Sequence, residues 1–166
     1  MFSIANKCYT AMVTIPGVIS QTLYPYISRT KEIILFRRTL TLSIIVFICF
    51  LTTILSFRDY LILLLFNIEN QIFSTIFLIL ISGSTINFIN IMIGHPLLSA
   101  FGFSNYTNKS IILSSIAYVI LVTISGFIFK NIYLVVMSII LQHFVALIIR
   151  IYYLKKTKLY VKIFNL

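Results

Sequence analysis

Apolar residues along this chain gather in four runs that are each long enough to cross a bilayer. The runs cover Thr39–Phe57, Gln71–Gly94, Ser110–Phe129 and Ile132–Leu154. A helix needs about 20 mostly apolar residues to cross a hydrocarbon core that is about 30 Å thick. The pattern therefore predicts four membrane-spanning helices.

A fifth helix, over residues 2–28, is predicted by a different pattern. Its polar and small residues recur in alternating steps of four and three, which places them on one face of a helix. We therefore predict an all-α, polytopic membrane helix bundle of five transmembrane helices, forming a single membrane domain over residues 1–166. The polar face comprises Ser3, Lys7, Thr10, Thr14, Gly17, Gln21, Tyr24 and Ser28.

The connections between these spans carry further signals. The apolar run Leu61–Phe66 is too short to cross, so we expect a short helix on the outer side at about residues 60–67. The segment His95–Lys109 is the longest predicted loop. A tight turn at Lys130 and Asn131 predicts that the last two spans form a helical hairpin.

Basic residues outnumber acidic ones by 13 to 3, which gives a formal net charge of +10. They lie at helix ends and in short loops, so they indicate topology and not nucleic-acid binding. With five alternating spans, ten basic residues fall on one side and three on the other, which predicts that the first side is cytoplasmic and includes the C-terminus. The ten are Arg29, Lys31, Arg37, Arg38, Lys109, Arg150, Lys155, Lys156, Lys158 and Lys162, and the three are Lys7, Arg58 and Lys130.

This orientation places the N-terminus outside, with Lys7 close behind it and no helix before it. One interpretation is an unusual first helix. The favoured one is that the sequence is the end of a longer protein whose earlier helices set the topology.

Three polar residues stand out within the predicted spans. Lys7 either extends its ammonium group to the membrane interface or lines a water-filled cavity. His143 and Arg150 are seven residues apart on one helix face. For Arg150 we favour interfacial anchoring, whereas His143 is either functional or hydrogen-bonded between helices.

Asn87 and Asn90 share a helix face with Gly83 and Gly94, at steps of four, three and four. Such a stripe forms either a polar cavity wall or a closely packed helix interface, in which small residues and amides join neighbouring helices. We favour the packed interface.

The sequence shows no residues arranged for catalysis or for binding a cofactor. The acids Glu32, Asp59 and Glu69 lie outside the apolar runs, and no pair is placed for acid–base catalysis. Cys8 and Cys49 lack metal-ligand spacing. The sequence thus predicts a protein that is not an enzyme and has no metal site and no cofactor.

Two stretches resemble a known family. The stretch Phe2-Ser-Ile-Ala-Asn-Lys7, followed by Leu23-Tyr-Pro-Tyr-Ile-Ser-Arg29, resembles the eighth helix of Wzx-type polysaccharide (O-antigen) flippases. These belong to the multidrug/oligosaccharidyl-lipid/polysaccharide exporter superfamily. The segment Ala146–Lys156 is similar to the end of those proteins. The resemblance covers the whole chain, which looks like helices eight to twelve, part of the C-terminal lobe of a two-lobe transporter.

This resemblance implies that an undecaprenyl-pyrophosphate-linked oligosaccharide is moved across the bacterial cytoplasmic (inner) membrane by alternating access. Its implied partners are that substrate, the lipid bilayer, a coupling proton or sodium ion and other envelope polysaccharide assembly proteins, with no nucleic acid. Anionic pyrophosphate and polar sugars need a wet, positively charged path. The candidate residues of that path are Lys7, Thr10, Thr14, Gln21, Asn87, Asn90, His143 and Arg150.

Three alternatives remain at this point. A multidrug exporter of the same superfamily moves cationic drugs and favours acids inside the membrane, which the five predicted spans lack. A membrane enzyme of envelope polysaccharide synthesis needs a large outer loop or acids and histidines near a membrane face. The third alternative is an inactive truncated product.

Overall fold

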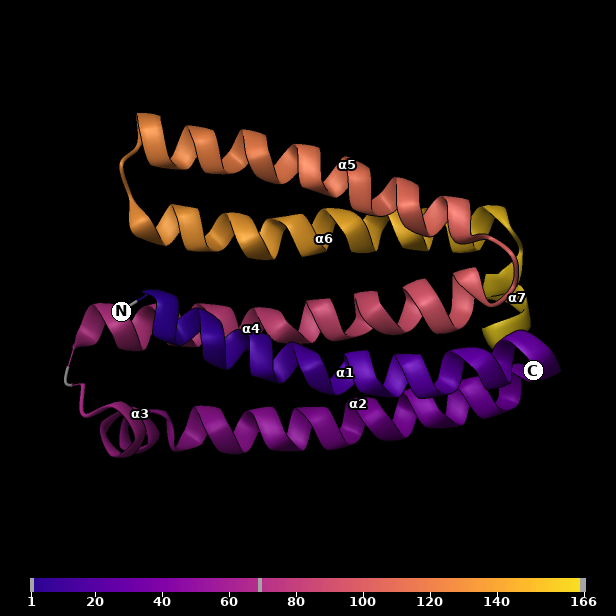
Figure 1. Ribbon diagram of the computed structural model, residues 1–166, viewed down its shortest axis with the longest axis horizontal. Helices are drawn as coiled ribbons and strands as arrows, with labels where there is room; N and C mark the ends of the chain where they lie inside the picture. The colour runs from indigo at the N-terminus through magenta and orange to yellow at the C-terminus, as the bar shows by residue number, and fades with distance from the viewer. Residues whose placement is uncertain (1, 69, 165–166) are drawn as a thin grey trace.

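The computed structural model describes residues 2–68 and 70–164, and this part of the chain is helical with no strand. The long helices lie side by side as an elongated bundle (Figure 1). The elements are α1 (Phe2–Thr30), α2 (Ile33–Ser56), α3 (Arg58–Phe66), α4 (Gln71–Ile93), η1 (Gly94–Ser99), α5 (Ser104–Thr123), η2 (Ile124–Ile128), α6 (Ile132–Lys156) and α7 (Leu159–Phe164).

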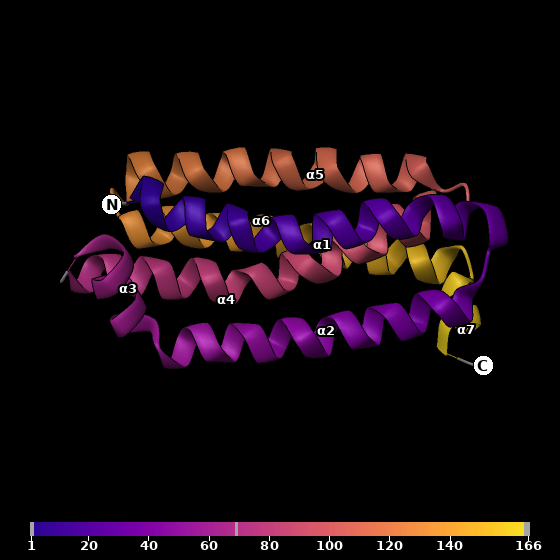
Figure 2. The same cartoon turned by 60° about the horizontal axis from the view of Figure 1, so that its bottom comes forward.

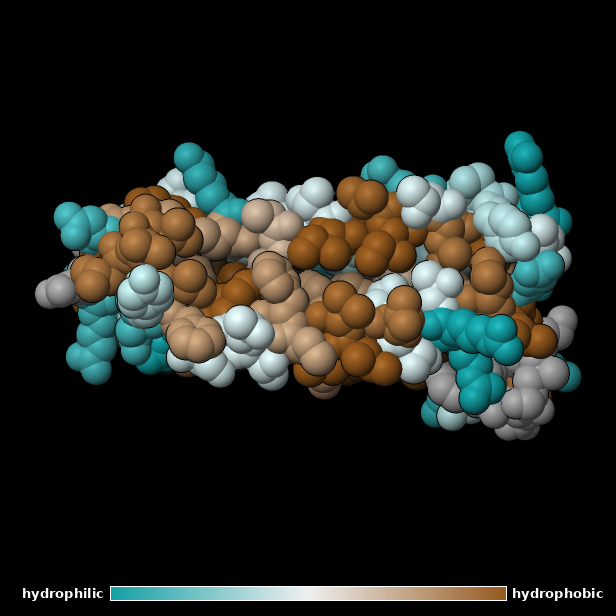
Figure 3. Space-filling model, turned by 90° about the horizontal axis from the view of Figure 1, so that it is seen from below, coloured by the Kyte–Doolittle hydropathy of each residue, from teal (hydrophilic) through white to brown (hydrophobic). Residues whose placement is uncertain are grey.

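Four of these helices are long and apolar enough to cross a membrane. They are α2, α4 continued through η1, α5 continued through η2, and α6. Seen from below the bundle, apolar residues cover much of the middle and hydrophilic ones concentrate toward the two ends (Figure 3). Both observations suggest a membrane protein. Although α1 is also long, it is not among the four, because its polar residues lower its hydropathy.

The long helices alternate in direction, as Figures 1 and 2 both show. The turn between α1 and α2, the turn between η1 and α5, and α7 lie at one end, which we call the basic end. The start of α1, helix α3 and the α5–α6 turn lie at the other. The predicted grouping of loops at the two ends of the bundle is therefore confirmed.

Helix α4 forms the centre of the bundle. It contacts α1 on one side and α6 on the other, while α5 packs against α6. Its buried residues include Phe73, Ile76, Leu80 and Phe88, which are almost completely enclosed. Phe88 also packs against Phe47 of α2, with tilted rings whose centroids are 4.6 Å apart. The buried share of α4 is the largest among the four apolar helices, which makes α4 the scaffold for the polar contacts described below.

The predicted loop over His95–Lys109 is wrong in extent. Most of it is helical, because η1 extends α4 and α5 begins at Ser104. Pro96 lies inside η1, a π-helical turn, and such wider turns tolerate a missing amide hydrogen. The chain reverses direction at Gly102, which has a φ of 88° that favours glycine.

The short outer helix was predicted close to its true position, since α3 covers Arg58–Phe66. Asn67 ends it in the left-handed conformation, with φ of 52°, which asparagine tolerates better than most residues. Ser74 of α4 donates a 2.9 Å hydrogen bond to the Asp59 carboxylate. Hydrogen bonds from Arg58 and Ser74 hold the pKa of the Asp59 carboxyl below its usual range. Glu69, predicted to lie in this connection, is outside the described residues.

The predicted hairpin of α5 and α6 is confirmed. Lys130 turns the chain with a φ of 48°. The Asn131 side chain then caps α6 by accepting a 2.9 Å hydrogen bond from the amide of Tyr133. The two helices pack along their length (Figure 1).

Candidate functional site

The predicted polar face of α1 points out of the bundle. Lys7, Thr10, Thr14 and Gln21 are all exposed. We call these four residues the outer polar face. The opposite side of α1 is buried, largely against α4, and consists of Ala5, Tyr9, Met12, Pro16, Ser20, Leu23 and Ile27.

The polar groups on the outer polar face differ in whether they have hydrogen-bond or ion-pair partners. The Thr10 and Thr14 hydroxyls donate to backbone carbonyls one turn earlier, at 2.8 and 3.0 Å. The Lys7 ammonium group has no carboxylate partner among the residues that the structure describes. Lys7 is therefore the charged group on this face that is available to an anion.

A second polar cluster lies between helices. The Asn87 amide of α4 donates a 2.9 Å hydrogen bond to the Tyr9 hydroxyl of α1. The same hydroxyl lies at hydrogen-bond distance, 2.7 Å, from His143 Nε2 of α6, and which of the two donates depends on the imidazole tautomer. Three helices thus meet at the Tyr9 hydroxyl.

The same cluster continues toward the basic end. The Asn90 amide donates a 2.6 Å hydrogen bond to the carbonyl of His143. Arg150 of α6 is only 7% exposed. It donates through Nε to the Ser110 hydroxyl of α5 at 2.9 Å, and through its guanidinium to the carbonyl of Asn90. We call Tyr9, Asn87, Asn90, Ser110, His143 and Arg150 the interhelical network.

The glycines flanking this network allow close helix packing. A Cβ atom at Gly83 would lie 2.5 Å from Cγ1 of Ile140 on α6. A Cβ atom at Gly94 would lie 2.8 Å from a guanidinium nitrogen of Arg150. The stripe from Gly83 to Gly94 is therefore a packed interface with α6, as we favoured from the sequence.

The structure thus divides the eight predicted path residues into two groups. Lys7, Thr10, Thr14 and Gln21 lie on the outer polar face, whereas the other four belong to the interhelical network. For Arg150, the expected interfacial anchoring is wrong, because the neighbouring helices supply enough hydrogen-bond acceptors to enclose its side chain. Assignment of the four network residues, Asn87, Asn90, His143 and Arg150, to a substrate path stays a prediction.

Two members of the network were not predicted, Tyr9 and Ser110. Tyr9 lies on the buried side of α1, away from the polar face that drew attention to this helix. Ser110 belongs to a row of buried hydroxyl residues with Thr107 and Ser114, at steps of three and four. That spacing could have indicated a polar face on this helix. The predicted span began at Ser110, however, and so left out Thr107.

Neither cluster has the composition of a metal centre, and the described residues contain no group of three or more His, Cys, Asp or Glu that could hold a metal ion. The oxygen of the Asn90 side-chain amide is buried without a hydrogen-bond partner. Comparisons with protein-family models, curated proteins and solved structures gave no match to this chain. The two clusters are therefore the features of this chain that bear on its function.

Proposed function

We propose that the chain is part of a flippase that moves a lipid-linked oligosaccharide across the bacterial cytoplasmic membrane, resembling the Wzx-type proteins. The supporting observation is the outer polar face of α1. A helix that packs beside apolar spanning helices, yet exposes a lysine, two threonines and a glutamine, suits a water-filled path better than lipid.

In this proposal α1 is a fifth spanning helix and forms one wall of the path. Its buried side fixes it to α4, and its outer polar face meets the substrate. Lys7 attracts the pyrophosphate, while Gln21 and the threonine hydroxyls form hydrogen bonds with sugars or with water. A second lobe supplies the facing wall, and the two lobes alternate in access.

The interhelical network has a supporting role in this proposal. It joins α1, α4, α5 and α6 through hydrogen bonds to side chains and to backbone carbonyls. Helices joined in this way move as one body, which is what alternating access of two lobes requires. The proposed orientation places the basic end in the cytoplasm, because positive residues are retained there.

The test replaces Lys7 by Gln in a strain whose surface polysaccharide depends on this protein. We expect surface polysaccharide to fall severalfold at equal protein level, with lipid-linked oligosaccharide accumulating inside, because the path loses its cation. Lys130→Gln is the matched control, since Lys130 lies in the turn at the same end of the bundle but not on α1. Unchanged export in Lys7→Gln, or equal loss in both variants, would contradict the proposal.

A further inference from the structure

The basic end carries a group of exposed cations where helix α7 lies beside the start of α2. Helix α7 contacts both α6 and α2, and it runs across the long axis of the bundle (Figures 1 and 2). Two segments that are far apart in the sequence are thereby brought together. We call the five exposed cations on them the α2–α7 corner: Arg37, Arg38, Lys155, Lys156 and Lys158.

Little negative charge offsets this corner. Among the described residues at the basic end, Glu32 is the one acid. It lies in the α1–α2 turn and lines the same cavity as Arg38, but it forms no ion pair with Arg38. Its carboxylate instead accepts a 3.0 Å hydrogen bond from the Tyr26 hydroxyl. In the part of the chain that the structure describes, five cations therefore stand against one carboxylate.

The corner lies at the depth of lipid headgroups. Helix α2 has 24 residues, so it is about 36 Å long at 1.5 Å per residue, longer than a hydrocarbon core of about 30 Å. Arg37 and Arg38 lie within about 8 Å of its start, from where their long side chains can reach the headgroup layer. Lys155 and Lys156 form the last turn of α6 at the same end of the bundle. The cations of the corner are thus within reach of the headgroups of one leaflet.

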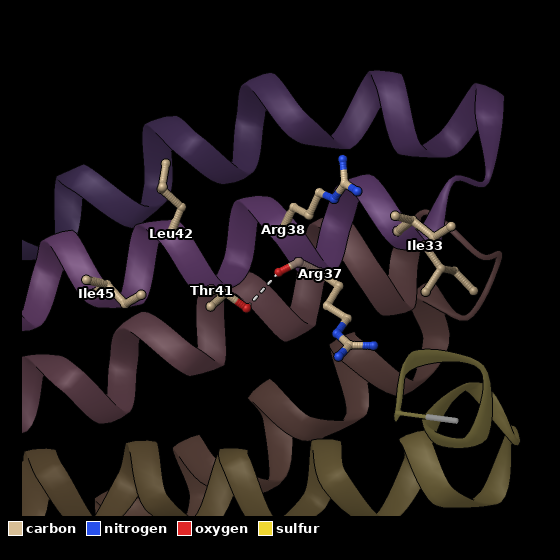
Figure 4. Close-up of a pocket in the computed structure, with 7 residues that line it drawn as sticks. Ile33, Arg37, Arg38, Thr41, Leu42 and Ile45 are labelled. Atoms are coloured by element: carbon tan, nitrogen blue, oxygen red, sulfur yellow. Dashed lines mark hydrogen bonds between the residues drawn. The ribbon is translucent and has the colours of Figure 1, made fainter. Parts of the chain in front are cut away.

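The start of α2 adds a further attraction for an anion. Glu32 precedes the helix without a side-chain hydrogen bond to its first turn, so the amides there carry the positive end of the helix dipole without a side-chain cap. Figure 4 shows Arg38 on the side of α2 toward α1 and Arg37 on the other side. Guanidinium groups recognise phosphate through paired N–H donors. A phosphate at the start of α2 therefore meets an arginine on either side.

Apolar side chains next to the corner are exposed as well. On α2, Leu42 and Ile45 follow the arginines and are 67% and 56% exposed, and Val161 of α7 is 50% exposed. A soluble anion gains nothing from these side chains, whereas the acyl chains of a lipid remove them from water. The corner is therefore better suited to a phospholipid than to free phosphate.

We propose that the α2–α7 corner binds the headgroup of an anionic phospholipid and enriches such lipids beside α2 and α7. The inference goes beyond the proposed function, because it concerns the lipid around the protein and not the molecule that is moved. It also differs from the retention of positive loops, since it depends on two distant segments that the tertiary structure brings together. It requires no particular orientation in the membrane.

The chain contains no tryptophan, so a single introduced one reports on its own surroundings. Val161→Trp on α7 and Leu64→Trp on α3 place this probe at opposite ends of the bundle, at side chains that are 50% and 64% exposed in the parent. The full chain is placed in phosphatidylcholine vesicles with a minor fraction of brominated lipid, which quenches tryptophan fluorescence on contact. We expect brominated phosphatidylglycerol to quench Val161→Trp more strongly than brominated phosphatidylcholine does, and the two lipids to quench Leu64→Trp equally.

Charge variants in the Val161→Trp background test whether the corner causes this preference. Arg37→Gln and Arg38→Gln should each lower the preference about fivefold, because one cation near a membrane surface contributes about 1 kcal/mol toward an anionic lipid. Arg38→Lys should retain most of it. Lys109→Gln is the matched control, since Lys109 is exposed but belongs to α5, on the far side of the bundle from α2 (Figure 1). It should leave the preference unchanged.

Equal quenching of Val161→Trp by the two lipids would overturn the proposal. So would an equal effect of Lys109→Gln and the arginine variants, which would show a response to net charge alone. Loss of the preference in sodium phosphate, but not in sodium chloride of the same ionic strength, would assign the corner to a soluble anion and reject the lipid site. Circular dichroism verifies that each variant is folded. If Val161→Trp does not fold, Ile34→Trp at the start of α2, 56% exposed in the parent, replaces it.

Discussion

At the scale of single residues, the Tyr9 hydroxyl joins side chains from two other helices. It accepts a hydrogen bond from Asn87 and is hydrogen-bonded to His143 Nε2, and the Tyr9 and His143 rings stack with centroids 6.2 Å apart. An aromatic residue at this position combines apolar packing on α4 with a polar contact at its tip. Tyr9 therefore links α1 to the rest of the bundle.

Tyr9→Phe removes that hydroxyl and leaves the Asn87 amide and His143 Nε2 without their partner. We expect the apparent free energy of unfolding in detergent to fall by about 1 kcal/mol, since interhelical hydrogen bonds in membranes are modest in strength. Thermal unfolding followed by circular dichroism measures it. Tyr60→Phe is the control, because Tyr60 is 63% exposed, and an equal loss in both variants would show that the network contributes nothing.

At the scale of the elements, the contact between α4 and α6 depends on the absence of a side chain at Gly83. Ile140 occupies the space that a Cβ atom would need. By contrast, a Cβ atom at Gly17 of α1 would meet nothing within 4 Å. Both glycines lie in helices. Replacing each of them by alanine therefore separates the effect of packing from the effect of helix propensity.

We expect Gly83→Ala to destabilise the bundle by about 1–3 kcal/mol, the usual cost of overpacking a closely packed site. Gly17→Ala should be neutral or stabilising, since alanine favours a helix by about 1 kcal/mol over glycine. Unfolding of the two variants in the same detergent gives the comparison. Combining Gly83→Ala with Ile140→Val should recover part of the loss, and no recovery would place the strain elsewhere.

At the scale of the whole molecule, the distribution of charge sets the proposed orientation. The basic end gathers most of the cations, and Lys31 at this end bonds to the Ala100 carbonyl and lies over the Phe101 ring, 5.5 Å from its centroid. This contact joins the α1–α2 turn to the η1–α5 turn. The opposite end holds Lys7, Arg58 and Lys130.

We expect opposite accessibility for the two ends in the cell. With Cys8 and Cys49 replaced by Ala, a membrane-impermeant maleimide should label Lys130→Cys in intact spheroplasts and Lys158→Cys only in inverted vesicles. We expect this labelling because positively charged loops are retained in the cytoplasm. Labelling of Lys158→Cys from the outside would reverse the orientation.

Local sequence patterns predicted that the chain is helical, where its long apolar helices lie and that α5 and α6 form a hairpin. These features follow from local properties: runs of about 20 apolar residues, helical periodicity and turn residues such as Lys130 and Asn131. The polar face of α1 was visible for the same reason, because spacing along one helix fixes which residues share a side.

The contacts of each polar residue could not be predicted in this way, because they depend on how the helices pack. Spacing placed Asn87, Asn90 and Arg150 on helix faces, but the partner of a face depends on which helix packs against it. Arg150 is buried because the Ser110 hydroxyl of α5 and the Asn90 carbonyl of α4 accept its hydrogen bonds. The role of Tyr9 follows only from its position beside His143 of α6.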